Sequence, residues 1–167
     1  DILWNDFLTI GSTEGPENIS VEKQVFKKHS GKRYLSTVTN QSLAEALRNR
    51  GFDAKQAFMT LLEPYTSFKQ KEILKDYWLQ ITAEEIKKMA ASPLVTIGSH
   101  GYYHNDLAKI VNEDMISELR GSKEYLETLI HKHVTALAFP YGSYSPAVIE
   151  EAIRSGYQQL LATEFLY

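Results

Sequence analysis

The fold of this chain is decided by residues 94–104, which read LVTIGSHGYYH. The first five residues are apolar or small, which is typical of a strand buried on both faces. Two imidazoles, His100 and His104, follow in a loop after that strand and can converge on one metal ion. Because parallel α/β folds carry their chemistry in the loops after strand C-termini, we expect an active-site loop here.

A second stretch of the same design follows at residues 135–146, which read TALAFPYGSYSP. A strand-like run again ends in a loop, here one rich in Pro, Gly and Tyr. The pattern around both stretches predicts three parallel strands near 94–98, 135–139 and 158–163, joined by helices near 83–91, 113–130 and 146–155. The two loops should then lie side by side at the carboxyl ends of the parallel strands.

Capping residues bound the three expected helices. Thr82 with Glu85 three places later forms a capping box, and Ser145 before a proline gives a second N-cap. Asn112 is the expected N-cap of the long middle helix, and Gly156 is the expected stop of the last one.

Residues 1–81 lack this regular alternation. Apolar and polar residues alternate from 19 to 25, and residues 33–38 are expected to return as a hairpin partner. Short helices are expected over residues 43–50, 53–62 and 66–79. We therefore interpret residues 1–81 as a mostly helical elaboration and residues 82–167 as an α/β part, the two forming a single structural domain.

Composition indicates an ordinary folded chain. Of its 167 residues, 43% are hydrophobic and 23% charged, which is enough apolar material for a buried core. The net charge of −3 gives no general attraction to nucleic acid, and no apolar run approaches the roughly 20 residues of a membrane span. The absence of cysteine excludes thiolate metal sites and disulfides. We expect no nucleic-acid partner and no membrane-spanning segment.

The two histidines of the first loop are candidate metal ligands. Neutral imidazole suits zinc and other borderline divalent ions, and two ligands from one loop need a third protein ligand. A pair of exposed histidines on a polar loop is the alternative, but the position after a strand favours a metal site. The remaining histidines, His29, His131 and His133, lie in Lys-rich, turn-like surroundings typical of a surface.

Four segments together give the chain a family resemblance. They read ITAEEIKKM at 81–89, IGSH at 97–100, HNDL at 104–107 and AFPYGSYS at 138–145. In this order and spacing they resemble the polysaccharide deacetylase family, metal-dependent carbohydrate esterases that contain the NodB-homology domain. The likeness covers roughly residues 81–163. It implies an α/β fold that is part of a distorted (β/α)7 barrel, with residues 1–81 as an N-terminal insertion.

The resemblance also implies a reaction and roles for particular residues. Acetyl groups would be removed from N- or O-acetylated sugars of a polysaccharide, with a divalent metal ion, zinc before others, held by His100 and His104. The segment Pro140, Tyr141 and Gly142 would contact the glycan substrate. The backbone N–H of Tyr141 would stabilise the tetrahedral oxyanion.

Some family features are missing from the sequence. The Asp-Asp pair that supplies the catalytic base and the third metal ligand is absent, and Ala138 stands where many members have an arginine that braces the aspartate. The later motifs, which carry the histidine general acid, would lie beyond Tyr167. We therefore interpret the chain as a truncated, inactive middle portion of a deacetylase, whose open sheet edge offers a route to oligomerisation.

Two other functions stay open. A non-catalytic, deacetylase-like carbohydrate-binding module would keep the fold and lose the aspartates. The residue pair encoded upstream of Asp1 would distinguish that module from an enzyme. A different metallohydrolase would require carboxylates after other strands, and the sequence offers no suitable one.

Overall fold

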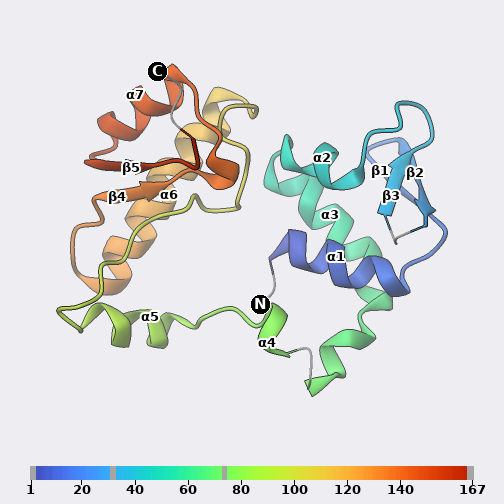
Figure 1. Ribbon diagram of the computed structural model, residues 1–167, viewed down its shortest axis with the longest axis horizontal. Coiled ribbons are helices and arrows are strands. Elements are labelled where there is room, and N and C mark those ends of the chain that lie inside the picture. Colours follow the sequence, from blue (N-terminus) through green and yellow to red (C-terminus); the bar gives the residue numbers. More distant parts are fainter. Residues whose placement is uncertain (1–2, 31–32, 73–74, 165–167) are drawn as a thin grey trace. The chain divides into compact units, whose positions relative to one another are not determined.

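The computed structural model describes residues 3–30, 33–72 and 75–164 (Figure 1). The chain divides into two compact units, Asp1–Gln80 and Ile81–Tyr167. Both units contain helices and strands, so the protein has a mixed α/β architecture. Closure of the strands into a barrel stays a prediction.

The N-terminal unit contains a three-stranded antiparallel meander. Its strands are β1 (Asn18–Val21), β2 (Gln24–His29) and β3 (Arg33–Ser36), paired in that order. Along β1 the apolar side chains Ile19 and Val21 are buried and the polar ones are exposed. The predicted hairpin is therefore confirmed, although its last strand ends at Ser36 rather than at residue 38.

Helices complete the N-terminal unit. They are α1 (Trp4–Glu14), α2 (Leu43–Arg48), α3 (Phe52–Leu62) and α4 (Lys75–Trp78), with the 3-10 turns η1 (Glu63–Tyr65) and η2 (Ser67–Gln70). The helix expected over 66–79 is divided between η2 and α4, and residues 73–74 of that prediction lie outside the described residues.

Helix α1 has no counterpart in the sequence prediction. Its middle carries glycine, threonine and serine residues of low helix propensity, and its N-cap residue Leu3 makes no capping hydrogen bond. Tertiary packing compensates, because the buried Phe7 ring lies edge-on to Phe58 of α3 and Phe68 of η2, at centroid distances of 6.3 and 6.0 Å. Packing, not propensity, therefore explains this helix.

The C-terminal unit follows the predicted order of helices and strands, except at the strand expected over 94–98. Its elements are α5 (Ala83–Ala90), α6 (Asn112–Ile130), β4 (Ala136–Ala138), the 3-10 turn η4 (Pro140–Gly142), α7 (Pro146–Arg154) and β5 (Gln159–Leu161). Strands β4 and β5 pair in parallel, with Leu137 opposite Leu160 (Figure 1). The parallel direction of these two strands is as predicted.

The strand expected at 94–98 forms only a single bridge at its end. Ser99 is bridged in parallel to Leu137, with hydrogen bonds of 2.9 Å from Ser99 N to Ala136 O and from Ala138 N to Ser99 O. The prediction is wrong for the extent of this strand. Strand β4 is only three residues long, and with Ser99 opposite Leu137 it offers no pairing partner to residues 94–97. Leu94 is accordingly 93% exposed.

Most of the predicted caps are confirmed. The Thr82 capping box and the Ser145 N-cap both form, and Gly156 follows α7 with a φ of +90°. The Asn112 cap is wrong by one position. The first intrahelical bond of α6 runs from Met115 N to Val111 O, so Val111 is the N-cap and Asn112 is already helical.

The core of the C-terminal unit joins α6, α7 and the β4–β5 sheet. Leu119 of α6, Leu137 of β4 and Ala152 of α7 are fully buried in it. The loops after Ser99 and after β4 lie beside each other, because Ser99 and β4 run in parallel and both loops leave from their carboxyl ends.

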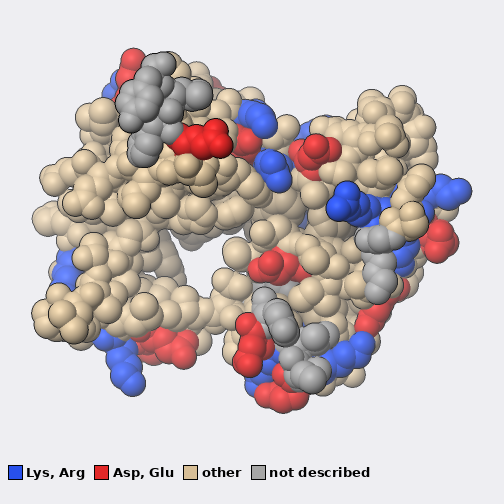
Figure 2. All heavy atoms as spheres, in the orientation of Figure 1, with Lys and Arg blue, Asp and Glu red and all other residues tan. Residues whose placement is uncertain are grey.

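Charged side chains of both signs are visible on the face shown in Figure 2. On that face, Lys and Arg side chains alternate with Asp and Glu in small groups. Of the helices in the described ranges, none is long and apolar enough to cross a membrane.

Candidate active site

His100 directly follows the bridge between Ser99 and β4. Its Nδ1 lies 2.8 Å from the backbone oxygen of Ala138, the last residue of β4. Because a carbonyl oxygen can only accept a hydrogen bond, Nδ1 carries the proton and the neutral ring has an unprotonated Nε2. A backbone carbonyl that fixes the other ring nitrogen in this way is typical of a metal-binding histidine.

His104 lies against both His100 and Tyr141. The ring centroids of the two histidines are 4.9 Å apart, and the His104 and Tyr141 centroids are 4.6 Å apart. The Nδ1 of His104 is 3.1 Å from the Tyr141 hydroxyl. His104 also has a φ of +55°, in the left-handed region that non-glycine residues rarely adopt. This bend brings the two predicted ligands together.

The histidine loop, residues 100–105, is wrapped around a buried carboxylate. Glu118 of α6 is 2% exposed and accepts hydrogen bonds from the backbone N–H of Tyr102 at 2.6 Å and of Tyr103 at 2.9 Å. A third bond of 2.5 Å comes from Asn105 Nδ2. Because a buried carboxylate requires donors in place of water, these bonds fix the path of the loop.

Gly101 allows the loop to approach Glu118 closely. Its φ is +78°, and a Cβ at this position would lie 2.9 Å from Glu118 Oε2. On the other side of Gly101, its N–H donates to Ser99 Oγ at 3.3 Å, and that hydroxyl lies 2.7 Å from Ser122 Oγ. Glu118 and Ser122 are one helical turn apart, so a single face of α6 holds the loop.

The second loop is the turn Pro140–Gly142 at the end of β4. Tyr141 has φ +60° and ψ +9°, and Gly142 has φ +66°. The N–H of Gly142 donates to Phe139 O at 2.9 Å, and the next amide donates to Pro140 O at 3.1 Å. A Cβ on Gly142 would overlap Thr163 Oγ1 and lie 3.0 Å from Thr163 Cβ. The turn is therefore constrained by its own backbone and by packing after β5.

The buried carboxylate of Glu151, paired with two exposed arginines, joins α6 to α7. Glu151 of α7 accepts from Arg120 at 2.7 Å and from Arg154 at 2.6 Å, and its side chain is 2% exposed. Burial raises the pKa of Glu151, but the hydrogen bond and charge of Arg120, together with Arg154, outweigh burial and hold the pKa below its ordinary value of 4.5. Glu151 is therefore charged at neutral pH.

The imidazoles suit a divalent metal ion but do not complete a site. His100 and His104 could supply two nitrogen ligands, and a site that binds tightly needs at least one more protein ligand. Within residues 3–30, 33–72 and 75–164, no group of three or more His, Cys, Asp or Glu side chains could hold a metal ion. Asp106, next but one to His104, is 1% exposed and pairs with Lys109 at 3.1 Å.

Two contributors to this site are absent from the sequence prediction. Glu118 is a charged residue on the buried face of α6, which also contains Met115 and Leu119. Because buried charges are rare, a glutamate at this position in the apolar pattern could have been predicted to have a specific role. The hydroxyl of Tyr141 reaches His104 across 37 residues of sequence. No local pattern predicts that contact.

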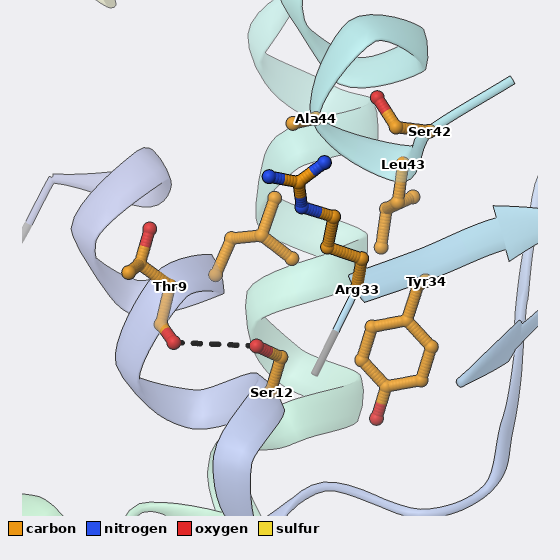
Figure 3. Close-up of a pocket in the computed structure, with 8 residues that line it drawn as sticks. Thr9, Ser12, Arg33, Tyr34, Ser42, Leu43 and Ala44 are labelled. Carbon is orange, nitrogen blue, oxygen red and sulfur yellow. Dashed lines mark hydrogen bonds between the residues drawn. The ribbon is translucent and has the colours of Figure 1, made fainter. Parts of the chain in front are cut away.

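A separate pocket lies in the N-terminal unit (Figure 3). Its volume is about 400 Å³, and Leu8, Tyr34 and Leu43 line it beside the Arg33 guanidinium. Ser12 donates to Thr9 O at 3.2 Å along one wall. No residue predicted as a site residue lines this pocket.

Residues 37–160 match the family described as polysaccharide deacetylase. The match covers well over half of the sequence, and the chain belongs to the polysaccharide deacetylase family. It begins earlier than the resemblance read from the motifs, which starts at residue 81. The family interpretation of the sequence is therefore confirmed.

Two proteins are similar to part of the chain. The Bacillus subtilis (strain 168) protein "Putative polysaccharide deacetylase YxkH" is 30% identical over 84 residues, which are 50% of this chain and 30% of that protein. The solved structure of Streptococcus pyogenes deacetylase PplD in complex with acetate is 26% identical over 47% of this chain and 34% of that one, with a TM-score of 0.45. The chain thus matches about a third of the length of each.

Proposed function

We propose that this chain is part of a metal-dependent hydrolase that removes acetyl groups from N- or O-acetylated sugars of a polysaccharide. The observation that carries the proposal is the meeting of His100 and His104, with ring centroids 4.9 Å apart, beside the turn that contains Tyr141. Membership of the polysaccharide deacetylase family supports the same reaction.

His100 and His104 are the proposed metal ligands. The family is generally metal-dependent, and the hydrogen bond to Ala138 O gives His100 the tautomer that a ligand requires. A divalent ion, zinc before others, would supply Lewis-acid polarisation of the acetyl carbonyl and a lower pKa for water. Glu118 keeps the loop between the two histidines in one conformation, so little ordering is needed when the ion binds.

Pro140, Tyr141 and Gly142 are the proposed substrate contacts, with the backbone N–H of Tyr141 as oxyanion donor. The support is conformational. Tyr141 and Gly142 both have positive φ, and the backbone of the turn is held by hydrogen bonds from Gly142 N to Phe139 O and from Ser143 N to Pro140 O. A donor that is already oriented stabilises the negative charge on the acetyl oxygen without reorganising.

The remaining catalytic groups are proposed to lie in the parent protein outside this chain. We propose that residues 82–167 form the central part of a distorted (β/α)7 barrel and that residues 1–81 are an insertion. The absence of an Asp-Asp pair from the 167 residues supports a base and third ligand from elsewhere. The chain alone would then be inactive.

A non-catalytic carbohydrate-binding module is the second candidate. It is favoured by one observation, the lack of a third metal-ligating side chain beside His100 and His104 among the residues that the structure describes. Such a module would bind a glycan and release no acetate.

Acetate release from acetylated chito-oligosaccharides separates the two candidates. We expect release by the parent protein that contains this chain, loss of release on His100→Ala, and no release by the chain alone. His133→Ala is the control, because that side chain is 95% exposed. A parent protein that binds the oligosaccharide without releasing acetate would favour the binding module. Activity in the bare chain would place the base within these residues.

Zinc calorimetry on the chain tests the ligands separately from turnover. Replacing either His100 or His104 with alanine should weaken zinc binding sharply, whereas His133→Ala should leave it unchanged. Equal effects at all three positions would rule out a specific site.

A further inference from the structure

Three exposed tyrosines gather on the histidine loop and α6. This tyrosine cluster consists of Tyr102, Tyr103 and Tyr125, which are 46%, 37% and 48% exposed. The Tyr102 ring centroid lies 4.7 Å from that of Tyr103 and 6.1 Å from that of Tyr125, in edge-to-face geometry. Exposed apolar side chains scattered singly need no explanation, but aromatic rings gathered into a patch indicate a binding surface.

The backbone beneath the cluster is fixed. Glu118 accepts from the amides of both Tyr102 and Tyr103. A Cβ added to Gly121 would lie 3.5 Å from Tyr102 Cδ2, so the Tyr102 ring packs over a bare stretch of helix.

One face of α6 therefore supports the whole cluster. Glu118, Gly121 and Tyr125 lie at positions i, i+3 and i+7, which share a helical face. Rings held in this way lose little conformational freedom when a ligand binds. A preorganised surface of this kind binds more tightly than the same side chains on a mobile loop.

The cluster borders the proposed metal ligands. Tyr102 and Tyr103 lie between His100 and His104 in the sequence, and Tyr103 directly precedes His104. Consecutive Cα atoms are about 3.8 Å apart. The backbone of Tyr102 and Tyr103 therefore lies within a few residues of both proposed ligands, in the loop along which a polymer bound at the histidine pair would extend.

We propose that the tyrosine cluster is a subsite that binds the sugar units next to the one being deacetylated, an inference that rests on the proposed function. Sugar rings present C–H groups on their faces and hydroxyls at their edges, which match the aromatic faces and phenol hydroxyls of tyrosine. The three side chains present phenol hydroxyls and no cationic group. They therefore suit a neutral N-acetylated oligosaccharide better than an anionic polymer.

The test is a calorimetric titration of the full chain with N-acetylglucosamine and with its β-linked tetramer. Tyr102→Ala and Tyr125→Ala should each weaken tetramer binding between about threefold and about tenfold, and should leave the monomer affinity unchanged. Tyr65→Ala is the matched control, because Tyr65 is 37% exposed and belongs to the N-terminal unit. Tyr102→Phe keeps the ring and should retain most of the affinity.

The outcomes separate the subsite from the hydrolase. Tetramer affinity that is unchanged in both alanine variants, or no tetramer binding by the unaltered chain, would overturn the subsite. Tyrosine-dependent binding in a parent protein that releases no acetate would keep the subsite and reject the hydrolase. Acetate release that depends on His100, together with tyrosine-independent binding, would keep the hydrolase and reject the subsite.

Discussion

The histidine loop is held by side chains from a helix, whereas the turn Pro140–Gly142 is held by its own backbone. Glu118 makes three hydrogen bonds to the histidine loop, and the Ser99–Ser122 contact adds a second attachment to α6. The turn instead relies on two residues with positive φ and on the absence of a side chain at Gly142. Both loops nevertheless meet, through His104 and Tyr141.

This difference separates two ways of positioning a site. The turn is closed by hydrogen bonds between its own peptide groups, from Gly142 N to Phe139 O and from Ser143 N to Pro140 O. A loop that carries two histidines and two tyrosines has no such local constraint. It depends on a buried acceptor at a distance, so it should be the more vulnerable of the two to a single substitution.

The largest effect should come from Glu118→Ala. The change leaves three hydrogen-bond donors without their acceptor, and we expect the C-terminal unit to lose about 3 kcal/mol of stability. Amide hydrogen exchange should accelerate at Tyr102 and Tyr103 but not at Gly142. Glu124→Ala is the control on the exposed side of the same helix. If Tyr102 and Tyr103 stayed protected, another group would hold the loop.

A smaller effect is expected from Gly142→Ala. Alanine is strained at a φ of +66° and meets Thr163, and together these cost about 2 kcal/mol. Gly156→Ala is the matched comparison, because its φ is +90° but its nearest neighbours, on Lys123, are 3.6 Å or more from the added Cβ. Chemical denaturation should therefore show a larger loss for Gly142→Ala. Equal losses would mean that Thr163 does not constrain the turn.

The smallest effect should be the loss of stability at low pH, which should be the same for the histidine loop and for the turn Pro140–Gly142. The pKa of Glu151 is below 4.5, so its stabilising contribution is complete above that pH and is lost as the pH falls through the folded-state pKa. Because Glu151 joins α6 to α7, both loops should lose exchange protection together. Glu151→Gln should reduce this pH dependence, and Glu150→Gln, an exposed neighbour, should not. Loss of protection in one loop alone would contradict the shared support.

The elements of the C-terminal unit illustrate what local sequence can predict. The Thr82 capping box, the Ser145 N-cap and the helical stop at Gly156 all involve residues within a few positions of one another. The strand at 94–98 shows the limit of such reasoning, because its apolar composition is real but its pairing depends on the length of β4. Helix α1 shows the converse, a helix of weak propensity stabilised by the packing of Phe7.

For the candidate site, the sequence by itself determined which residues stand after which strand. Hydrophobic periodicity and the family motifs together predict that His100, His104 and Tyr141 lie near one another, at the carboxyl ends of parallel strands. Tertiary structure alone decided that Glu118 fixes the histidine loop and that the Tyr141 hydroxyl contacts His104. Those contacts join residues 16 and 37 positions apart. They form only because the packing of α6 and β4 brings distant parts of the chain within hydrogen-bond distance.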